Sequence, residues 1–428
     1  MNTCVSSYLD SFLSQIEKQA QQIPELLEIF LNCYTNTLNH AVTRLEDGTV
    51  YVVTGDIPAM WLRDSSAQMR PYLFPAKTDP RISMLIAEVI RKQFFYIEKD
   101  PYANSFNEKA NGACWDKNDL CSNPWVWEEK FELDSLCYPI QLAYLLWKNT
   151  GYTNQFDEIF QSGIQIILDS FQREQYHEEC SSYRFTRQNT YPTETLSRDG
   201  KGTLTNSGIG LVWSGFRPSD DACTYGYHIP SNMFAVVVLG YLEEIEEKIF
   251  QNLNLAKKAN LIKKQIQQGI ETYGKAKIKE FDWIYAYEVD GYGMYNLMDD
   301  ANVPNLLSIP YLGYPADTQV AQNTRRFILS QGNPFYYEGK QASGIGSPHT
   351  KVGYIWHIAM AMEGLTSSDS SYKLKILQKM ATTTAGKHLM HESFSCQDDS
   401  LYTREWFSWA NAMYCELFLD YLGYRLKI

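Results

Sequence analysis

The chain has 428 residues, of which 44% are hydrophobic and 14% aromatic, and its formal net charge is −12 at pH 7. The apolar fraction is sufficient for a sizeable core, and no stretch approaches the length of a membrane-spanning helix. Lys and Arg occur singly or in pairs, without a longer basic run, which argues against a nucleic-acid partner because a phosphate backbone requires a basic patch. A neutral, hydroxyl-rich ligand fits this composition better.

The cysteine pattern and the first residues bear on cellular location. The nine cysteines include no Cys-x-x-Cys pair, and their spacing indicates neither a zinc site nor a disulfide framework. Residues 1–10 lack the basic region and the continuous apolar run of a signal peptide. We therefore expect a reducing, cytoplasmic location without membrane association, and no cofactor.

Helical periodicity is the dominant pattern along the chain. The strongest signal lies in residues 81–99, where Ile82, Leu85 and Ile86 begin an apolar stripe at helical spacing. A candidate strand covers residues 183–186. The predicted helices cover residues 5–20, 24–37, 65–74, 81–99, 134–150, 154–174, 231–248, 255–273, 303–311, 316–330, 351–366, 371–385 and 406–426.

Short and long connections alternate between these helices. A short connection joins antiparallel neighbours, so each closely linked pair is predicted to form a helical hairpin. Strict alternation brings every long loop to the same end of such a bundle. We therefore predict an all-α fold, an (α/α)6 barrel of six helical hairpins whose long loops form the active-site rim. Neither a repeat nor a linker divides the sequence, so residues 1–428 are predicted to form one catalytic domain.

Similar polar clusters recur in the predicted loops. Each joins aromatic or amide side chains to carboxylates, as in Trp61, Arg63 and Asp64. Aromatic faces and hydrogen-bonding groups suit a sugar ring, which has apolar C–H faces and a rim of hydroxyls. The alternative is structural, with Arg63 and Asp64 as a loop ion pair and Trp61 as a core anchor. The other clusters are residues 115–116, 125–129, 213–221, 299–302 and 391–392.

Two acidic positions on these loops suit glycoside hydrolysis. A glycosidase needs one protonated carboxyl to release the leaving oxygen and one carboxylate on the other side of the scissile bond. Asp220 or Asp221, together with Glu392, could supply this pair. Alternatively, Asp220 or Asp221 caps a turn and Glu392 is simply solvated; the residues alone do not choose between the two aspartates.

Other chemistries have weaker support in the sequence. His391-Glu392 begins like a zinc-protease helix, but position 395 is Ser and the second histidine is missing. Ser347 and His349 lack the Gly-x-Ser-x-Gly elbow of a hydrolase. A glycan-binding protein without catalysis remains open, since such a protein needs aromatic and amide contacts but no paired acid and base.

The ordered motifs closely resemble those of glycoside hydrolase family 125 over nearly the whole chain. They are Gly55–Asp64, Pro124–Glu128, Trp213–Asp221, Met298–Pro304, Gly346–His349 and His391-Glu392. The resemblance implies an exo-acting α-1,6-mannosidase with an (α/α)6 barrel and an inverting, metal-independent mechanism. It implies Asp220 as general acid and Glu392 as general base, and it favours Asp220 over Asp221.

The same resemblance places Arg63, Asp64, Asn302 and His349 around the terminal mannose. Three aromatic residues are also predicted to bind substrate: Trp61, Trp127 and Tyr225. The predicted substrate is a mannose-containing oligosaccharide such as a trimmed N-glycan. The alternatives are an inverting α-glucosidase or trehalase-like hydrolase, and a non-catalytic glycan-binding protein.

Three further expectations concern mechanism. An inverting enzyme holds a water between its base and the anomeric carbon, so we expect Asp220 and Glu392 to lie roughly 6.5–9.5 Å apart. Trp213 and Phe216 are expected to give the acid an apolar setting that keeps it protonated. No complete metal-ligand set is apparent, so activity should survive prolonged chelation.

Overall fold

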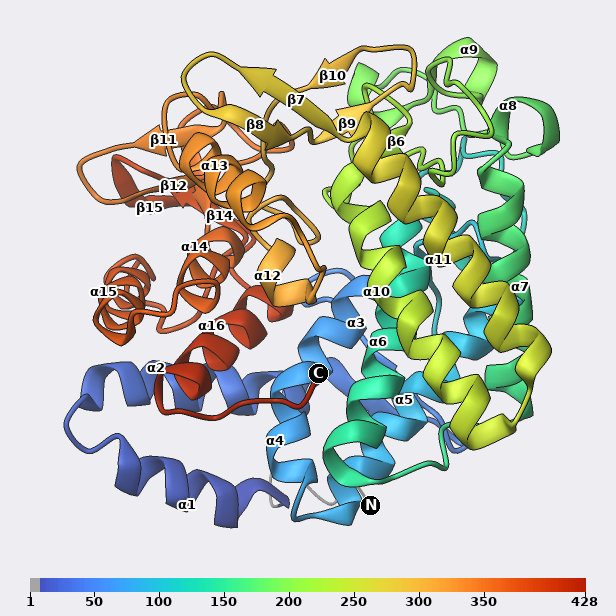
Figure 1. Cartoon of the computed structure of the whole chain (residues 1–428). Helices are drawn as coiled ribbons and strands as arrows, with labels where there is room; N and C mark the ends of the chain where they lie inside the picture. The colour runs from blue at the N-terminus through green and yellow to red at the C-terminus, as the bar shows by residue number, and fades with distance from the viewer. Residues whose placement is uncertain (1–7) are drawn as a thin grey trace. The chain divides into compact units, whose positions relative to one another are not determined.

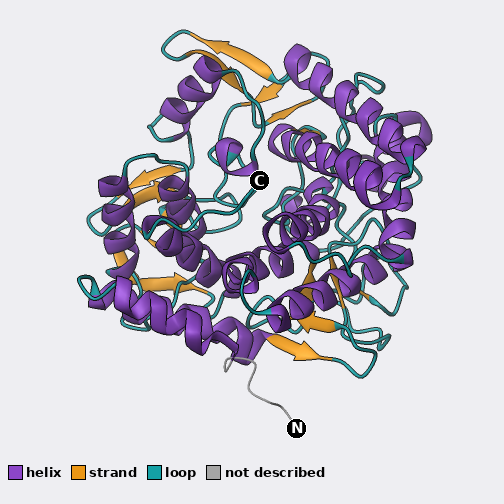
Figure 2. Ribbon diagram, turned by 60° about the horizontal axis from the view of Figure 1, so that its bottom comes forward, coloured by secondary structure: helices purple, strands orange, loops and turns teal. Residues whose placement is uncertain are grey.

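The computed structural model describes residues 8–428, so residues 5–7 of the first predicted helix lie outside the described part. Helices dominate and the strands are short (Figure 2). The chain groups into two compact units, which are described separately. The first comprises the residues up to Lys92 with Leu142–Gln155 and Tyr337–Ile428, and the second comprises Gln93–Gln141 and Phe156–Tyr336. No helix within residues 8–428 combines the length and the apolar character needed to cross a bilayer.

The first unit is organised around α16 (Ser408–Tyr421), which contacts α2, α3, α14 and α15. Nearly every side chain of α16 is buried, as expected for a helix that is apolar on all sides. Phe418 stacks on Phe30 of α2 with ring centroids 4.7 Å apart. The other elements of this unit are α1 (Asp10–Gln19), α2 (Pro24–Asn36), β1 (Val42–Arg44), β2 (Val50–Val52), β3 (Met60–Trp61), α3 (Leu62–Met69), α4 (Leu73–Ala76), β12 (Ser343–Ile345), β13 (Tyr354–Trp356), α14 (His357–Leu365), α15 (Ser370–Ala381), β14 (Ser393–Ser395) and β15 (Asp398–Thr403).

The second unit contains the long helical pair α10 (Ile229–Ile245) and α11 (Leu253–Tyr273), which lie side by side (Figure 1). α10 is buried on nearly all sides, whereas α11 buries one stripe that includes Ala259, Ile262 and Ile266. The other elements are β4 (Ser105–Phe106), β5 (Val126–Glu128), α7 (Glu158–Glu174), α8 (His177–Cys180), α9 (Ser197–Gly200), β6 (Tyr227–His228), β7 (Lys275–Ile278), β8 (Asp282–Tyr285), β9 (Glu288–Val289), β10 (Tyr295–Asn296), α12 (Ile309–Leu312) and α13 (Thr318–Ile328). Helices α5 (Pro80–Lys99) and α6 (Leu133–Thr150) and strand β11 (Tyr336–Glu338) contribute residues to both units.

Most predicted helices form, with three corrections. α3 begins at Leu62, so Arg63 and Asp64 lie in the first turn of a helix and not in the preceding loop. Residues 303–308 are irregular, and only Ile309–Leu312 of the predicted 303–311 helix is helical. The predicted 351–366 helix starts only at His357, because Tyr354–Trp356 pairs as a strand with Ser393–Ser395.

The strands are two to six residues long and, apart from β13, lie in the predicted loops. Residues 275–296 form the hairpin β7–β8 and the pair β9–β10, whereas we expected an irregular loop there. The candidate strand at residues 183–186 does not form; its Phe185 instead exchanges backbone hydrogen bonds with Gly200 and Leu196.

Candidate active site

In the first unit, residues 54–59 pack against the start of α16. The Ser408 N–H donates to the Thr54 carbonyl at 3.0 Å, and the Asp56 N–H donates to the Trp406 carbonyl at 3.4 Å. Gly55 has φ +140°, and a Cβ on it would lie 2.3 Å from the Trp406 oxygen. Only glycine tolerates both the backbone angle and the close approach, so this residue fixes the path of the chain into α3.

α3 carries Arg63 and Asp64 in its first turn, where both are buried. The Arg63 guanidinium lies over the Trp409 ring, 5.7 Å from its centroid, which is a cation–π arrangement. Trp61, the residue before α3, is also buried, and its indole N–H has no acceptor among the described residues. Buried donors of this kind are unusual in proteins and suit a site that binds a polar ligand.

Glu392 directly precedes β14, the central strand of the sheet β13–β14–β15. Ser393 pairs with Thr403 in an antiparallel register, which brings Glu392 next to Arg404. The two side chains approach to 3.6 Å, between Arg404 Nη1 and Glu392 Oε1. Arg404 is itself held by Asp56 at 2.6 Å, so the loop before α3 helps to orient the carboxylate.

His391 fixes the backbone at this position, because both of its ring nitrogens face main-chain carbonyls. Its ring nitrogens lie 3.2 Å from the Glu405 carbonyl and 3.1 Å from the Thr384 carbonyl, and its ring stacks on Tyr402 with centroids 4.0 Å apart. His357 supports the same point, because its Nδ1 lies 3.1 Å from both backbone N and O of His391. Burial lowers the pKa of His357 to about 3, so that ring is neutral at pH 7, and burial also lowers the pKa of His391.

His349 lies in the loop after β12, and its side chain is exposed. Its backbone N–H donates to Ser347 Oγ at 3.2 Å, so the main chain of His349 takes part in this contact between the serine and the histidine. The ring lies edge-on to Trp356 with centroids 6.3 Å apart. An exposed imidazole beside an indole can donate or accept a hydrogen bond from a sugar hydroxyl.

In the second unit, Asp220 sits at the tip of a tight turn. The Asp220 N–H donates to the Arg217 carbonyl at 2.9 Å, the Arg217 N–H donates to the Asp221 carbonyl at 2.8 Å, and Phe216 bridges to Ala222. Asp220 has φ +64°, a left-handed angle that a non-glycine residue adopts only when its surroundings hold it there. The turn leaves the Asp220 side chain half-buried while Asp221 is fully buried, which separates the two aspartates.

Asn104 joins Asp220 to two further carboxylates. Its Nδ2 lies 3.2 Å from Asp220 Oδ1, and 3.5 Å from both Glu128 Oε2 and Glu132 Oε1. Asn104 precedes β4, which pairs with β5 so that Ser105 is opposite Glu128. This strand pairing therefore brings a neutral amide and three acids together.

Two buried cations hold the acidic group in place. Lys130 Nζ lies 2.8 Å from Glu194 and 3.5 Å from Glu128, and Arg187 contacts Glu128 at 2.8 Å and Asp119 at 2.6 Å. Burial raises the pKa of Glu128, and so does the negative charge of Asp220, while Lys130 and Arg187 oppose the rise. Burial opposes ionisation of Lys130, but Glu128, Asp220 and Glu194 together raise its pKa.

Asp221 belongs to a second cluster of buried polar residues. Arg217, whose backbone N–H binds the Asp221 carbonyl, forms a buried ion pair with Glu288 at 2.5 Å. Burial raises the pKa of the Asp300 carboxyl. The positive charge of Arg217 opposes this rise, whereas the negative charge of Asp221 adds to it. Asn302 donates from both its backbone and its side-chain nitrogen to Asp300 Oδ1 at 3.1 Å, which leaves its amide oxygen as an acceptor.

The two remaining aromatic candidates also lie in the second unit. The backbone N–H of Tyr225 donates to Glu288 Oε2 at 3.3 Å, and its side chain is half-buried. Trp127, on β5, is half-buried, and its indole N–H has no acceptor among the described residues. Trp213 stacks on His177 with ring centroids 3.6 Å apart, and the polar neighbours of Asp220 include Asn104, Glu128 and Lys130.

A mixed set of possible metal ligands lies elsewhere in the second unit. Ligand atoms of Asp100, Cys121 and Glu129 all lie within 4.8 Å of one another. Burial, followed by the charge of Asp100 and a hydrogen bond with it, raises the pKa of Glu129 to about 8. A carboxyl group with a pKa of about 8 keeps its proton at pH 7, so Glu129 and Asp100 can share that proton.

The predicted site residues thus fall into two groups. Trp61, Arg63, Asp64, His349 and Glu392 belong to the first unit, and Trp127, Asp220, Tyr225 and Asn302 belong to the second. Sequence reasoning missed Asn104 and Arg404, which carry no motif, and assigned no role to Glu128 although it ends the Pro124–Glu128 motif. A strand register, unknown from sequence, is what brings Asn104 to Glu128 and Arg404 to Glu392.

Comparison with known proteins adds independent evidence. The sequence profile of the family described as metal-independent alpha-mannosidase (GH125) matches residues 23–419. The meiotically up-regulated gene 157 protein of Schizosaccharomyces pombe is 37% identical, over 98% of this chain and 87% of that protein. A solved Streptococcus pneumoniae structure, from work on metal-independent α-mannosidases and the processing of N-linked glycans, is a non-productive complex with α-1,6-mannobiose. It is 49% identical with a TM-score of 0.96, over 98% of this chain and 99% of that one.

A more distant structure supports the fold alone. A bacterial glucoamylase in complex with acarbose has a TM-score of 0.59 at 13% identity, over 93% of this chain and 56% of that chain. The all-α (α/α)6-barrel class predicted from the alternation of loops is thereby confirmed. The family profile and the two relatives above show that the chain belongs to glycoside hydrolase family 125, the metal-independent α-mannosidases.

Proposed function

We propose that this chain is an exo-acting, inverting α-1,6-mannosidase, which removes terminal non-reducing α-1,6-linked mannose from oligosaccharides such as N-glycans. The observation that carries the proposal is the relative that is 49% identical and was solved with α-1,6-mannobiose. The sequence motifs support it, because they contain the acidic and sugar-binding side chains to which the family resemblance assigns these roles. The organisation of residues 1–428 as one catalytic domain is part of this proposal.

In this mechanism Asp220 protonates the glycosidic oxygen as the bond to the anomeric carbon breaks. Glu392 takes a proton from a water that attacks the anomeric carbon from the opposite face, so the product first appears as β-mannose. Arg63, Asp64, Asn302 and His349 bind the hydroxyls of the terminal mannose. Trp61, Trp127 and Tyr225 offer ring faces and, for the two tryptophans, buried N–H donors that have no acceptor among the described residues.

Release of mannose from a panel of mannobioses tests this function. We expect turnover of the α-1,6-linked disaccharide in the presence of a chelator, with little turnover of the α-1,2- and α-1,3-linked ones. Proton NMR of the first product should show β-mannose. Hydrolysis of trehalose or an α-glucoside instead would support the glucosidase alternative, and binding without release would support a glycan-binding protein.

A further inference from the structure

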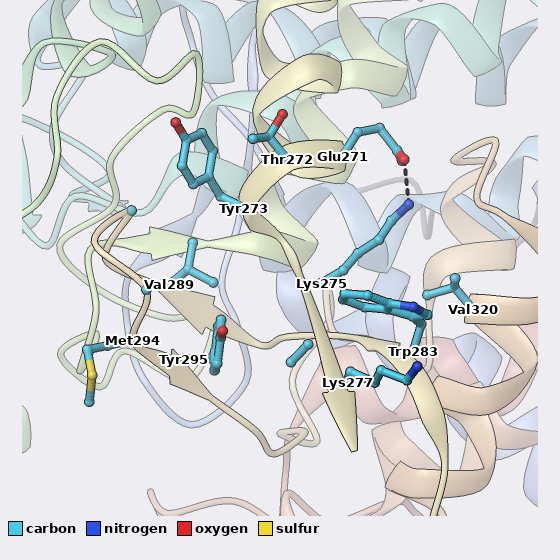
Figure 3. Close-up of a pocket in the computed structure, with 13 residues that line it drawn as sticks. Glu271, Thr272, Tyr273, Lys275, Lys277, Trp283, Val289, Met294, Tyr295 and Val320 are labelled. Atoms are coloured by element: carbon cyan, nitrogen blue, oxygen red, sulfur yellow. Dashed lines mark hydrogen bonds and ion pairs between the residues drawn. The ribbon is translucent and has the colours of Figure 1, made fainter. Parts of the chain in front are cut away.

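A groove of about 650 Å³ lies in the second unit among residues that none of the assignments above involve. The end of α11, strands β7 and β8, the turn between β9 and β10, and Val320 of α13 line it. Figure 3 shows Val289, Met294 and Tyr295 on one side, and Lys275, Trp283 and Val320 on the other. The groove is thus built from two strand pairs and two helices.

The groove exposes aromatic and apolar side chains on regular structure. Trp283 is 46% exposed and Tyr295 45%, and both belong to paired strands, opposite Lys277 and Val289 respectively. Met294, in the adjoining turn, is 55% exposed. Exposed aromatic and apolar groups that line one groove are typical of a binding surface, and strand pairing fixes the backbone positions of Trp283 and Tyr295.

The charges in the groove do not favour an ionic ligand. Lys275 forms an ion pair with Glu271 one helical turn earlier, which Figure 3 shows as a dashed line. Lys277 lies 3.6 Å from Asp282 and 6.0 Å from the centroid of the Trp283 ring. Each cation therefore has a carboxylate within reach, and an anionic ligand would meet those carboxylates.

We propose that this groove is a second carbohydrate-binding site, which takes a neutral oligosaccharide chain. The indole face of Trp283 and the phenol face of Tyr295 stack on the C–H faces of sugar rings, and the Tyr295 hydroxyl and the paired Lys and Glu side chains bind sugar hydroxyls. That the sugar is mannose rests on the proposed function. The groove holds an extended substrate to the enzyme while the terminal residue is removed at the active site.

Affinity electrophoresis in gels that contain a long, linear α-1,6-mannan tests the proposal. Each such chain has one non-reducing end, so an exo-acting site contributes little to retardation. The wild-type chain should be retarded, and Trp283→Ala or Tyr295→Ala should weaken mannan binding about five- to tenfold each, as expected for the loss of one ring contact. Tyr191→Ala removes another exposed ring, 79% exposed and outside the groove, and should migrate like the wild type.

Mannose release from α-1,6-mannobiose should be the same in all four proteins, because the disaccharide does not span a second site. Failure of the proposed function would abolish this release while leaving the retardation intact. The proposal of a carbohydrate site in the groove is wrong if the gel does not retard the wild type. It is also wrong if the gel retards Trp283→Ala and Tyr295→Ala as strongly as the wild type. Sedimentation that shows a dimer without mannan, and no dimer in Trp283→Ala, would also contradict the proposal. If Trp283→Ala fails to fold, Tyr295→Ala decides the result alone.

Discussion

At the scale of single residues, Asp220 and Glu392 differ in what their removal should do. Asp220→Asn cannot protonate the leaving oxygen, and Glu392→Gln cannot activate water, so either change should slow hydrolysis of α-1,6-mannobiose about 10²–10⁴-fold. An aryl mannoside with an acidic phenol leaves without a proton, so it should restore much of the rate of Asp220→Asn and none of that of Glu392→Gln. Initial rates on both substrates measure this. Equal rescue of both variants would contradict the assignment.

Glu128 should control the pH at which Asp220 works. The charge of Asp220 raises the pKa of Glu128, and the coupling between two carboxyl groups is mutual. Without the Glu128 charge, Asp220 still faces the cation Lys130 but loses one repelling carboxylate, while Glu132, Glu194 and Asp221 remain, so Asp220 should lose its proton more readily. Glu128→Gln should therefore move the alkaline limb of the kcat/KM profile to lower pH.

The pH profile of the aryl mannoside separates this effect from simple damage. With that substrate the acid is not needed, so the alkaline limb should not move in Glu128→Gln. Glu243→Gln is a matched control in the same unit, because Glu243 pairs with Lys263 at the surface. A profile of unchanged shape and lower height in Glu128→Gln would show a structural role only.

The chemistry of single residues could be predicted from sequence only in part. The motifs identify the Asp220-Asp221 pair, but the sequence alone cannot rank two adjacent aspartates. In the structure a backbone angle and a turn separate the two, leaving Asp220 half-buried and Asp221 buried, and the choice of Asp220 as the acid belongs to the proposed function. Asn104 could not be found at all, because an isolated Asn acquires its role only through the strand register beside it.

At the scale of elements, the junction between residues 54–59 and α16 depends on Gly55. Gly55→Ala adds a Cβ that would lie 2.3 Å from the Trp406 carbonyl oxygen, whereas a Cβ on Gly48 meets nothing within 4 Å. Both glycines have positive φ, so both changes introduce backbone strain of about 1–2 kcal/mol. Gly55→Ala should lower the free energy of unfolding by clearly more than Gly48→Ala, and it should also lower activity. Chemical denaturation of the two variants measures the difference, and equal losses would contradict the close contact.

Elements differ in how well sequence predicts them for a physical reason. Helix α5 repeats an apolar stripe over 20 residues, so its periodicity is unambiguous. Strands β9 and β10 have two residues each, too few to show an alternation. At Leu62, α3 begins three residues earlier than predicted because the break attributed to Gly55 and Pro58 ends at the extended residue Trp61.

At the scale of the whole molecule, several buried carboxyl groups make stability depend on pH. The pKa of Glu129 rises from an ordinary 4.5 to about 8 on folding, and burial also raises the pKa values of Glu128, Asp299 and Asp300. Between these values the folded chain holds a proton on Glu129 that the unfolded chain has lost. The free energy of unfolding should therefore fall as pH rises from about 4.5 to about 8.

Other groups act in the opposite direction at low pH. His357 is neutral in the folded chain down to about pH 3, whereas in the unfolded chain it gains a proton below 6.5, so stability falls as pH drops through this range. The pKa of Glu178 is lowered to about 2, mainly by its hydrogen bond with Arg198 and further by Lys201 and the Thr205 N–H. The stability that the ionised Glu178 contributes is therefore present above pH 4.5 and is lost as pH falls towards 2. The stability maximum should lie between these two sets of transitions, at about pH 4.5–6.5.

Glu129→Gln tests the alkaline side of this profile. The amide cannot ionise, so the variant should lose less stability than the wild type between about pH 6 and about pH 8.5, because the Glu129 ionisation near pH 8 is gone. Glu178→Gln is the matched control: Glu178 is ionised in both folded and unfolded chains above its ordinary 4.5, so this change should shift stability equally at both pH values. Denaturant unfolding of the three proteins at the two pH values gives the comparison. If Glu129→Gln falls as steeply as the wild type, Glu129 carries its charge in the folded chain at neutral pH, and the shared proton with Asp100 does not exist.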